Sequence, residues 1–214
     1  MTVTGGEPMA RVASLRTVPQ QARGRDKLAR MLAAADTIMA TEGADAITTT
    51  RIAAEAGISV GSVYHYLPHR GAIIEALAAH YLDQLEEQMA ELVTTLPARQ
   101  GRHGDLVRYA VDAFAEFYRA HPGFRALWFG RHLTAETREL DRAHKQRMAL
   151  GIRSMLVAQG IGRNDRKTLR ISLAIQLATD ALLQEAFREN PTGNTALLGE
   201  LKTMIRGYLA ALTS

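Results

Sequence analysis

The sequence predicts an all-α fold on three observations. Apolar residues have helical spacing, short segments with Gly, Pro or Asn separate the helical stretches, and no stretch has the alternating pattern of a strand. Apolar residues recur three and four positions apart, as on the buried face of a helix; one such row is Leu77, Tyr81, Leu85, Met89 and Leu92. Short segments with Gly, Pro or Asn interrupt these rows, and no useful stretch alternates apolar and polar residues. The number of breaks predicts about nine helices.

The first 24 residues are predicted to form a flexible basic tail. They lack helical periodicity and contain Gly5, Gly6, Pro8 and Pro19, which disfavour regular structure. A basic arm of this kind can lie on DNA phosphates or reach the minor groove. A merely solvated tail is the alternative.

Composition excludes several kinds of protein. The 214 residues include no Cys, which rules out disulfides, thiolate metal sites and cysteine nucleophiles. No apolar stretch has the roughly 20 residues of a membrane helix, and no apolar run follows the first basic residues as in a secretory signal. We therefore expect a cytoplasmic protein without a cofactor. The net charge of +4 permits an anionic partner without demonstrating one.

The segment from Thr48 to Tyr66 has the pattern of a helix-turn-helix. Thr48 is placed to cap a short helix, and Gly57 supplies the left-handed conformation that ends it. Ser59 is placed to cap a second short helix, on which Val63 and Tyr66 point back at the first. An ordinary corner in a helical bundle is the alternative, but it does not require this whole set of offsets.

The outer face of the second short helix is polar, and in a helix-turn-helix this face enters the major groove. If Val63 and Tyr66 face inward, Ser62, Tyr64 and His65 face outward. Arg70 opens the next helix, which we expect to run to about residue 96 and to join two domains. The predicted DNA contacts are Thr48, Thr49, Arg51, Ser59, Gly61, Ser62, Tyr64, His65 and Arg70.

Residues 28–77 resemble the DNA-binding domain of the TetR family of transcriptional regulators. The resemblance is carried by Ala33-Ala34-Ala35, Glu42-Gly43, Thr48-Thr49, Ile52-Ala53, Ala56-Gly57-Ile58-Ser59, Gly61-Ser62-Val63-Tyr64 and Tyr66-Leu67-Pro68-His69-Arg70. It implies a homodimeric, ligand-released repressor that binds a palindromic operator. It also implies a three-helix DNA-binding domain at residues 25–70 and a larger helical ligand-sensing and dimerisation domain at 71–214. Leu67 and Arg70 replace the usual Phe and Lys of the family.

Two carboxyl-terminal segments, 169–187 and 197–209, have broad apolar faces. Each face is wide enough to pack against its own domain on one side and against another subunit on the other. Two such helices from each of two subunits would form a four-helix interface whose two-fold symmetry matches a palindrome. The predicted dimer contacts are Leu173, Leu177, Gln184, Leu201, Ile205 and Tyr208.

A polar stripe at intervals of four, Gln176, Asp180 and Gln184, interrupts the first of these segments. A buried carboxylate needs a partner, so Asp180 is expected to meet an Arg, a ligand donor or a group across the dimer seam. A structurally paired acid and plain core packing of the apolar residues are the alternatives. The predicted contacts of a largely apolar small-molecule effector are Phe114, Phe117, Phe124, Trp128, Met148, Ile152, Gln176 and Asp180.

Two other classes of function are alternatives to DNA binding. A helical metal-dependent enzyme would need a third ligand beside pairs such as His132 and Glu136, or His144 and Asp141, and no recognisable spacing supplies one. No catalytic motif for hydrolysis or phosphate binding is present in the sequence. An adaptor that only pairs helices with another protein would show no salt-sensitive binding to one DNA palindrome.

Overall fold

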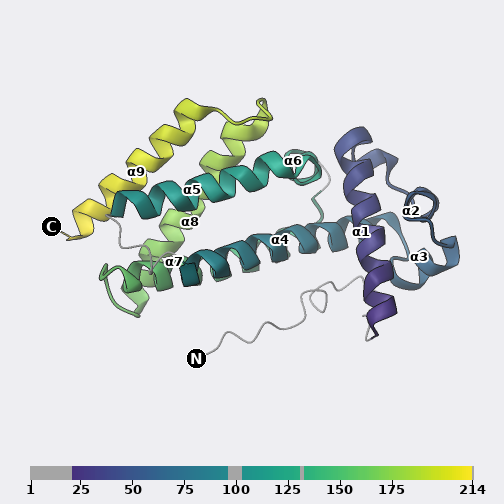
Figure 1. Ribbon diagram of the computed structural model, residues 1–214, viewed down its shortest axis with the longest axis horizontal. Coiled ribbons are helices and arrows are strands. Elements are labelled where there is room, and N and C mark those ends of the chain that lie inside the picture. Colours follow the sequence, from purple (N-terminus) through teal and green to yellow (C-terminus); the bar gives the residue numbers. More distant parts are fainter. Residues whose placement is uncertain (1–20, 96–102, 131–132, 214) are drawn as a thin grey trace. The chain divides into compact units, whose positions relative to one another are not determined.

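The structure, a computed structural model, describes residues 21–95, 103–130 and 133–213. Within these ranges the chain forms helices and no strand, which confirms the predicted all-α class. The elements are α1 (Ala22–Glu42), the 3₁₀ turn η2 (Ala44–Ala46), α2 (Thr49–Ala56), α3 (Val60–Tyr66), α4 (Arg70–Thr95), α5 (His103–Ala120), α6 (Pro122–Phe129), α7 (Ala135–Ala158), α8 (Arg166–Arg188) and α9 (Thr195–Thr213) (Figure 1).

Helix α1 begins at Ala22, so the last residues of the predicted tail are helical. The rest of that tail, residues 1–20, lies outside the described residues. No helix in the described ranges is both long enough and apolar enough to cross a membrane.

The chain divides into two compact units. The first unit consists of the chain up to Asp83 together with His121–Leu140, and the second consists of Gln84–Ala120 and the chain from Asp141 onward. Helices α4 and α7 each contribute residues to both units. The predicted domains instead meet at residue 70. In the structure, residues 71–83 and 121–140 group with the amino-terminal helices.

The core of the first unit is built on one face of α1, which packs against α2 and α6. Leu28, Met31, Ala35 and Ile38 recur at helical spacing on this face and are buried. Burying a large aliphatic side chain contributes about 1.5–3 kcal/mol, so this face alone orients α1 against its neighbours.

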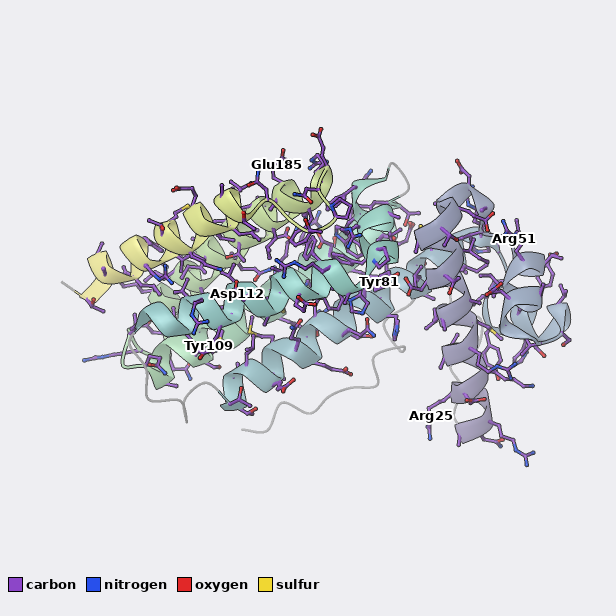
Figure 2. The ribbon with its side chains drawn as sticks, turned by 45° about the horizontal axis from the view of Figure 1, so that its top comes forward. Arg25, Arg51, Tyr81, Tyr109, Asp112 and Glu185 are labelled. Carbon is purple, nitrogen blue, oxygen red and sulfur yellow. The ribbon has the colours of Figure 1, made fainter. Side chains whose placement is uncertain are left out.

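A polar contact at Asp36 joins three helices of the first unit. Tyr81 of α4, labelled in Figure 2, donates its hydroxyl hydrogen bond to the Asp36 carboxylate of α1. Gly123 of α6 packs against both groups so closely that a Cβ there would overlap them. Burial and the Asp36 hydrogen bond raise the pKa of Tyr81, so its hydroxyl stays protonated and keeps donating.

In the second unit, α5, α8 and α9 pack together, as Figure 1 shows. The carboxylate of Glu86, on the second-unit part of α4, binds α7. It accepts from Arg147 Nε at 2.8 Å and lies 3.0 Å from His144 Nδ1. Burial raises the pKa of Glu86, but the hydrogen bonds from His144 and Arg147 outweigh burial and bring it to about 2.

Candidate nucleic-acid interface

The first helix of the predicted helix-turn-helix and the turn after it form as the sequence indicates; we call the whole segment from Thr48 to Tyr66 the corner. Thr48 precedes α2 in an extended conformation, and its Oγ1 accepts from the Arg51 N–H at 3.2 Å. Gly57 ends the helix at φ 62° and ψ 42°, in the left-handed region that disfavours any side chain. The Ile58 N–H then returns to the Ala53 carbonyl at 3.0 Å, which closes the end of α2.

Helix α3 is capped in the same way at Ser59. Its Oγ accepts from the Ser62 N–H at 3.2 Å and lies 2.9 Å from the Ser62 hydroxyl. Val63 is fully buried and Tyr66 is half-buried, so the inner face of α3 is the one predicted. Leu67, where the family usually has Phe, is buried and repacks the corner without exposing it.

The outer face of α3 is open to solvent. The side chain of Tyr64 is 48% exposed, an unusual setting for a large aromatic residue, and Gly61 and His65 are exposed beside it. A Cβ at Gly61 would meet no atom within 4 Å, so nothing in the described residues covers the backbone there. Ser62 is half-buried, and its hydroxyl already shares a hydrogen bond with Ser59.

Thr49 is the predicted DNA contact with the least accessible side chain. It is 8% exposed, so its hydroxyl offers little surface to a phosphate. Thr48, next to it, is exposed. A phosphate at the start of α2 would therefore meet the free N–H groups of the first turn rather than the Thr49 side chain.

The two predicted arginine anchors are both ion-paired. Arg51 (Figure 2) binds Glu42 with both ends of its guanidinium, Nη1 lying 2.6 Å from Oε2. The Arg51 hydrogen bond lowers the pKa of Glu42. Arg70 Nη2 lies 2.7 Å from Asp45 Oδ1. Sequence reasoning missed both acids, because residues 9 and 25 positions apart show no sequence sign of pairing.

Arg30 is a further residue that sequence reasoning missed. From α1 its Nη2 donates to the Gly57 carbonyl at 3.1 Å and also to the Ala56 carbonyl. These carbonyls lie at the carboxyl end of α2, where the helix dipole favours a cation. Arg30 therefore fixes the corner against α1. Periodicity marks Arg30 only as a residue on the exposed side of its helix.

The predicted effector contacts fall in both compact units. Phe114, Phe117, Met148, Ile152, Gln176 and Asp180 belong to the second unit, and all except Asp180 are buried. Phe124 and Trp128 belong to the first unit, where their rings stack 4.6 Å apart and Phe124 meets the ring of Tyr81 edge-on. Packing of these two rings in the core is the alternative to an effector contact that the sequence left open.

Asp180 meets a lysine, which the sequence did not indicate. Its Oδ2 lies 2.9 Å from Lys145 Nζ and accepts from Gln184 Nε2 at 3.0 Å. Lys145 also binds Asp141 at 2.7 Å. We call Asp141, Lys145 and Asp180 the acid–lysine cluster. In the described residues, no group of three or more His, Cys, Asp or Glu is placed to hold a metal.

The predicted dimer contacts divide into two sets. Leu177 and Tyr208 are exposed, whereas Leu173 and Gln184 are half-buried. Leu201 and Ile205 are buried, at 0% and 6% exposed, so they pack in the chain's own core and offer a partner little surface. Met204 and Leu212, which were not predicted, are exposed large apolar residues on α9. A broad apolar face does not reveal which of its sides packs inward.

The sequence matches two family descriptions in separate regions. Residues 31–77 match the bacterial regulatory proteins of the tetR family, and residues 101–213 match the tetracyclin repressor-like C-terminal domain. The first match contains the corner with its capped helices, and the second covers more than half of the chain.

The chain is also similar to curated nucleoid occlusion factors named SlmA. It is 26% identical to the factor from Haemophilus ducreyi over 99 residues, which are 46% of this chain and 47% of that protein. It is 24% identical to the factor from Vibrio atlanticus over 172 residues, covering 76% and 86% of the two chains. The chain spans about half the length of the first curated relatives that it matches.

Solved structures show the same fold. A TetR-family transcriptional regulator from Streptomyces coelicolor is 25% identical and has a TM-score of 0.71, with 90% of this chain and 100% of that one covered. The fatty acid degradation regulator FadR from Bacillus halodurans, 14% identical, has a TM-score of 0.63 and covers 85% and 95%, which shows the fold alone. The capped corner, the two family matches and the shared fold place this chain in the TetR family of transcriptional regulators, which are DNA-binding proteins and not enzymes.

Proposed function

We propose that the protein is a homodimeric repressor that reads a palindromic operator with α3 and is released by a small-molecule effector. The observation that carries the proposal is the open outer face of α3, where Tyr64 and His65 are exposed on a helix fixed by caps at both sides of the turn. Side chains on such a face reach base edges and phosphates in the major groove.

The roles within this face follow from chemistry. His65 presents ring nitrogens to a base edge, and the Tyr64 hydroxyl donates to a phosphate while its ring lies on a sugar. Exposed Gly61 lets the backbone approach the DNA closely. Arg51 and Arg70 contribute phosphate contacts. For this, each arginine must either leave its acid, Glu42 or Asp45, or bind the phosphate and the acid at the same time.

A second copy of the chain is the partner that a palindrome requires, since two recognition helices must meet successive major grooves about 34–36 Å or a multiple apart. The apolar side chains exposed on α8 and α9 support this pairing. They are Leu177, Met204, Tyr208 and Leu212.

Effector binding belongs to the second unit in this proposal, and α4 is the element that carries its consequence. Helix α4 starts at Arg70, beside the recognition helix in sequence, and its later residues bind α7 through Glu86. A ligand that favours a different setting of α4 would change the separation of the recognition helices. Coupling of this kind is typically about 1–3 kcal/mol.

Selection of bound DNA from a random pool, followed by binding assays at several salt concentrations, tests the proposal. We expect one palindrome, bound with a Kd of roughly 10⁻⁸–10⁻¹¹ M. His65→Ala should relax preference at one base position in each half-site. The matched variant Arg70→Ala should instead weaken binding to all sequences and reduce the salt dependence. Failure to enrich any DNA sequence would refute the proposed function.

A further inference from the structure

His69 caps the long helix that follows the recognition helix. Its backbone carbonyl accepts the first helical hydrogen bond of α4, from the Ile73 N–H at 3.2 Å. Its side chain accepts another, from the Ala72 N–H to Nδ1 at 3.1 Å. A side-chain acceptor bonded to the N–H three residues later is the geometry of a helix N-cap, a position that Ser, Thr, Asp or Asn usually holds. An imidazole at this position makes the cap sensitive to protons.

The cap defines the tautomer of the His69 ring. A backbone N–H can only donate, so Nδ1 is the accepting nitrogen and the proton of the neutral ring lies on Nε2. The ring also rests against the first turn, because a Cβ added at Gly71 would lie 3.2 Å from Nδ1. Within the described residues, the bond from Ala72 is the only hydrogen bond of this exposed side chain. An imidazolium has no accepting nitrogen, so uptake of one proton removes the cap.

Protonation of His69 also adds charge where a cation is unfavourable. The amino end of a helix carries partial positive charge, and Arg70 follows directly on the same helix. Asp45 of η2, which pairs with Arg70 at 2.7 Å, offsets only one of the two cations that would result. The nearest other imidazole in the chain is that of His65, four residues earlier on α3. Protonation therefore loosens the start of α4 through both the lost hydrogen bond and the added charge.

Arg70 is the predicted DNA contact that depends most directly on this cap. It is the first residue of α4, so the cap holds its backbone in the helix. Its side chain is 42% exposed, which leaves the guanidinium open to a phosphate. If the first turn frays, the guanidinium loses its fixed position, and binding must first restore that order at the expense of affinity.

We propose that His69 is a positioning residue for DNA binding. Its neutral imidazole holds the first turn of α4, and through it Arg70, in the arrangement that meets a phosphate. Acidification through the range in which histidines usually titrate, around pH 6.5, therefore weakens DNA binding. An imidazole that touched phosphate directly would act in the opposite direction, because its protonation adds a phosphate contact. The inference rests on the proposed function, since it concerns one contact of the DNA complex.

Binding of the full chain to the duplex selected from the random pool tests the inference. His69→Ala removes the cap and should weaken binding about fivefold at pH 8. His69→Asn keeps a capping acceptor that does not titrate, so it should bind like the wild type at pH 8. When the pH is lowered from 8 to 5.5, the wild type should lose up to about fivefold in affinity relative to His69→Asn.

His121 provides a matched control, because it precedes α6 as His69 precedes α4. It holds the N-cap position of α6, but its side chain forms no capping hydrogen bond. His121→Asn makes the same chemical change in the same compact unit. It should leave the pH dependence of DNA binding as it is in the wild type.

A double-mutant cycle tests whether His69 acts through Arg70. His69→Ala should lower affinity about fivefold in the otherwise unchanged chain, but less than about twofold in the Arg70→Ala background. Each single variant should reduce the salt dependence of binding by about one phosphate contact, and the double variant should reduce it no further.

Three results would each overturn the inference. The first is equal weakness of His69→Asn and His69→Ala at pH 8, which would show that the ring itself touches DNA. The second is a wild-type affinity that stays level or rises relative to His69→Asn as the pH falls, and the third is full additivity with Arg70→Ala. A chain that binds the selected duplex with unchanged affinity in His69→Ala refutes only this inference. A chain that enriches no DNA refutes the proposed function, and this inference falls with it.

Discussion

The helix-turn-helix corner and the α4–α7 contact at Glu86 are both held by polar side chains, but over very different lengths of chain. At the corner, Thr48 and Ser59 each bind a backbone N–H three residues later. Glu86 instead binds side chains 58 and 61 residues away. A local contact is specified by a short motif, whereas a distant contact exists only once the whole unit has folded.

The largest expected effect breaks the distant contact. Glu86→Gln should lower the free energy of unfolding at pH 7 by roughly 3 kcal/mol, since each pKa unit corresponds to about 1.4 kcal/mol and the pKa of Glu86 falls from 4.5 to about 2. Because this pKa is depressed in the folded chain, the stabilisation is complete above about pH 4.5 and disappears as the pH falls toward 2. Urea unfolding between pH 2 and 7 measures it.

Glu185→Gln is the control for this change, because Glu185 forms only an exposed pair with Arg188 one turn away. It should alter stability little at any pH. A Glu86→Gln deficit that stays constant from pH 7 to pH 2 would contradict the role given to the Glu86 carboxylate.

A second substitution tests a distant contact in the first unit. Gly123→Ala places a methyl group against the Asp36 carboxylate and the Tyr81 hydroxyl, so it should destabilise the protein by about 1–3 kcal/mol. Gly199→Ala, on α9, meets no atom within 4 Å and should be neutral or stabilising by up to about 1 kcal/mol. Thermal unfolding of both variants compares their stability. Equal stability would show that α6 shifts to accommodate the methyl group without destabilising the protein.

A third substitution tests the local contact. Ser59→Ala removes the cap of α3 and should cost about 1 kcal/mol, together with a larger loss of DNA affinity because the recognition helix frays. Ser154→Ala is its control, since that hydroxyl only bonds back to Leu150 in the middle of α7. Chemical denaturation and operator binding measure the two effects, and undiminished DNA affinity in Ser59→Ala would show that the cap is dispensable.

The smallest effect concerns binding rather than folding. Glu42→Gln frees Arg51 from its exposed ion pair, so affinity should rise for all DNA sequences and the salt dependence should steepen by about one phosphate contact. Glu200→Gln changes charge equally on an exposed part of α9 and should have a smaller, sequence-independent effect. Unchanged salt dependence in Glu42→Gln would show that Arg51 does not contact phosphate.

The sequence was sufficient to predict the fold class and the corner, since both depend on spacings of three and four residues. Caps at Thr48 and Ser59, the left-handed Gly57 and the buried Val63 were all predicted correctly. The partners of Arg51, Arg70 and Asp180 were not, because tertiary structure alone brings them together. For the same reason, periodicity did not separate buried Leu201 and Ile205 from exposed Met204 and Leu212.

The Arg30 contact limits how small a working DNA-binding fragment of this protein can be. A peptide cut to residues 48–66 would retain both caps and Gly57, but the last carbonyls of α2 would lose the guanidinium that α1 supplies. Short isolated helices are marginal in water even when capped. A graft intended to transfer the proposed operator reading of α3 to another scaffold must therefore carry α1 from before Arg30, or rebuild a cation at that position.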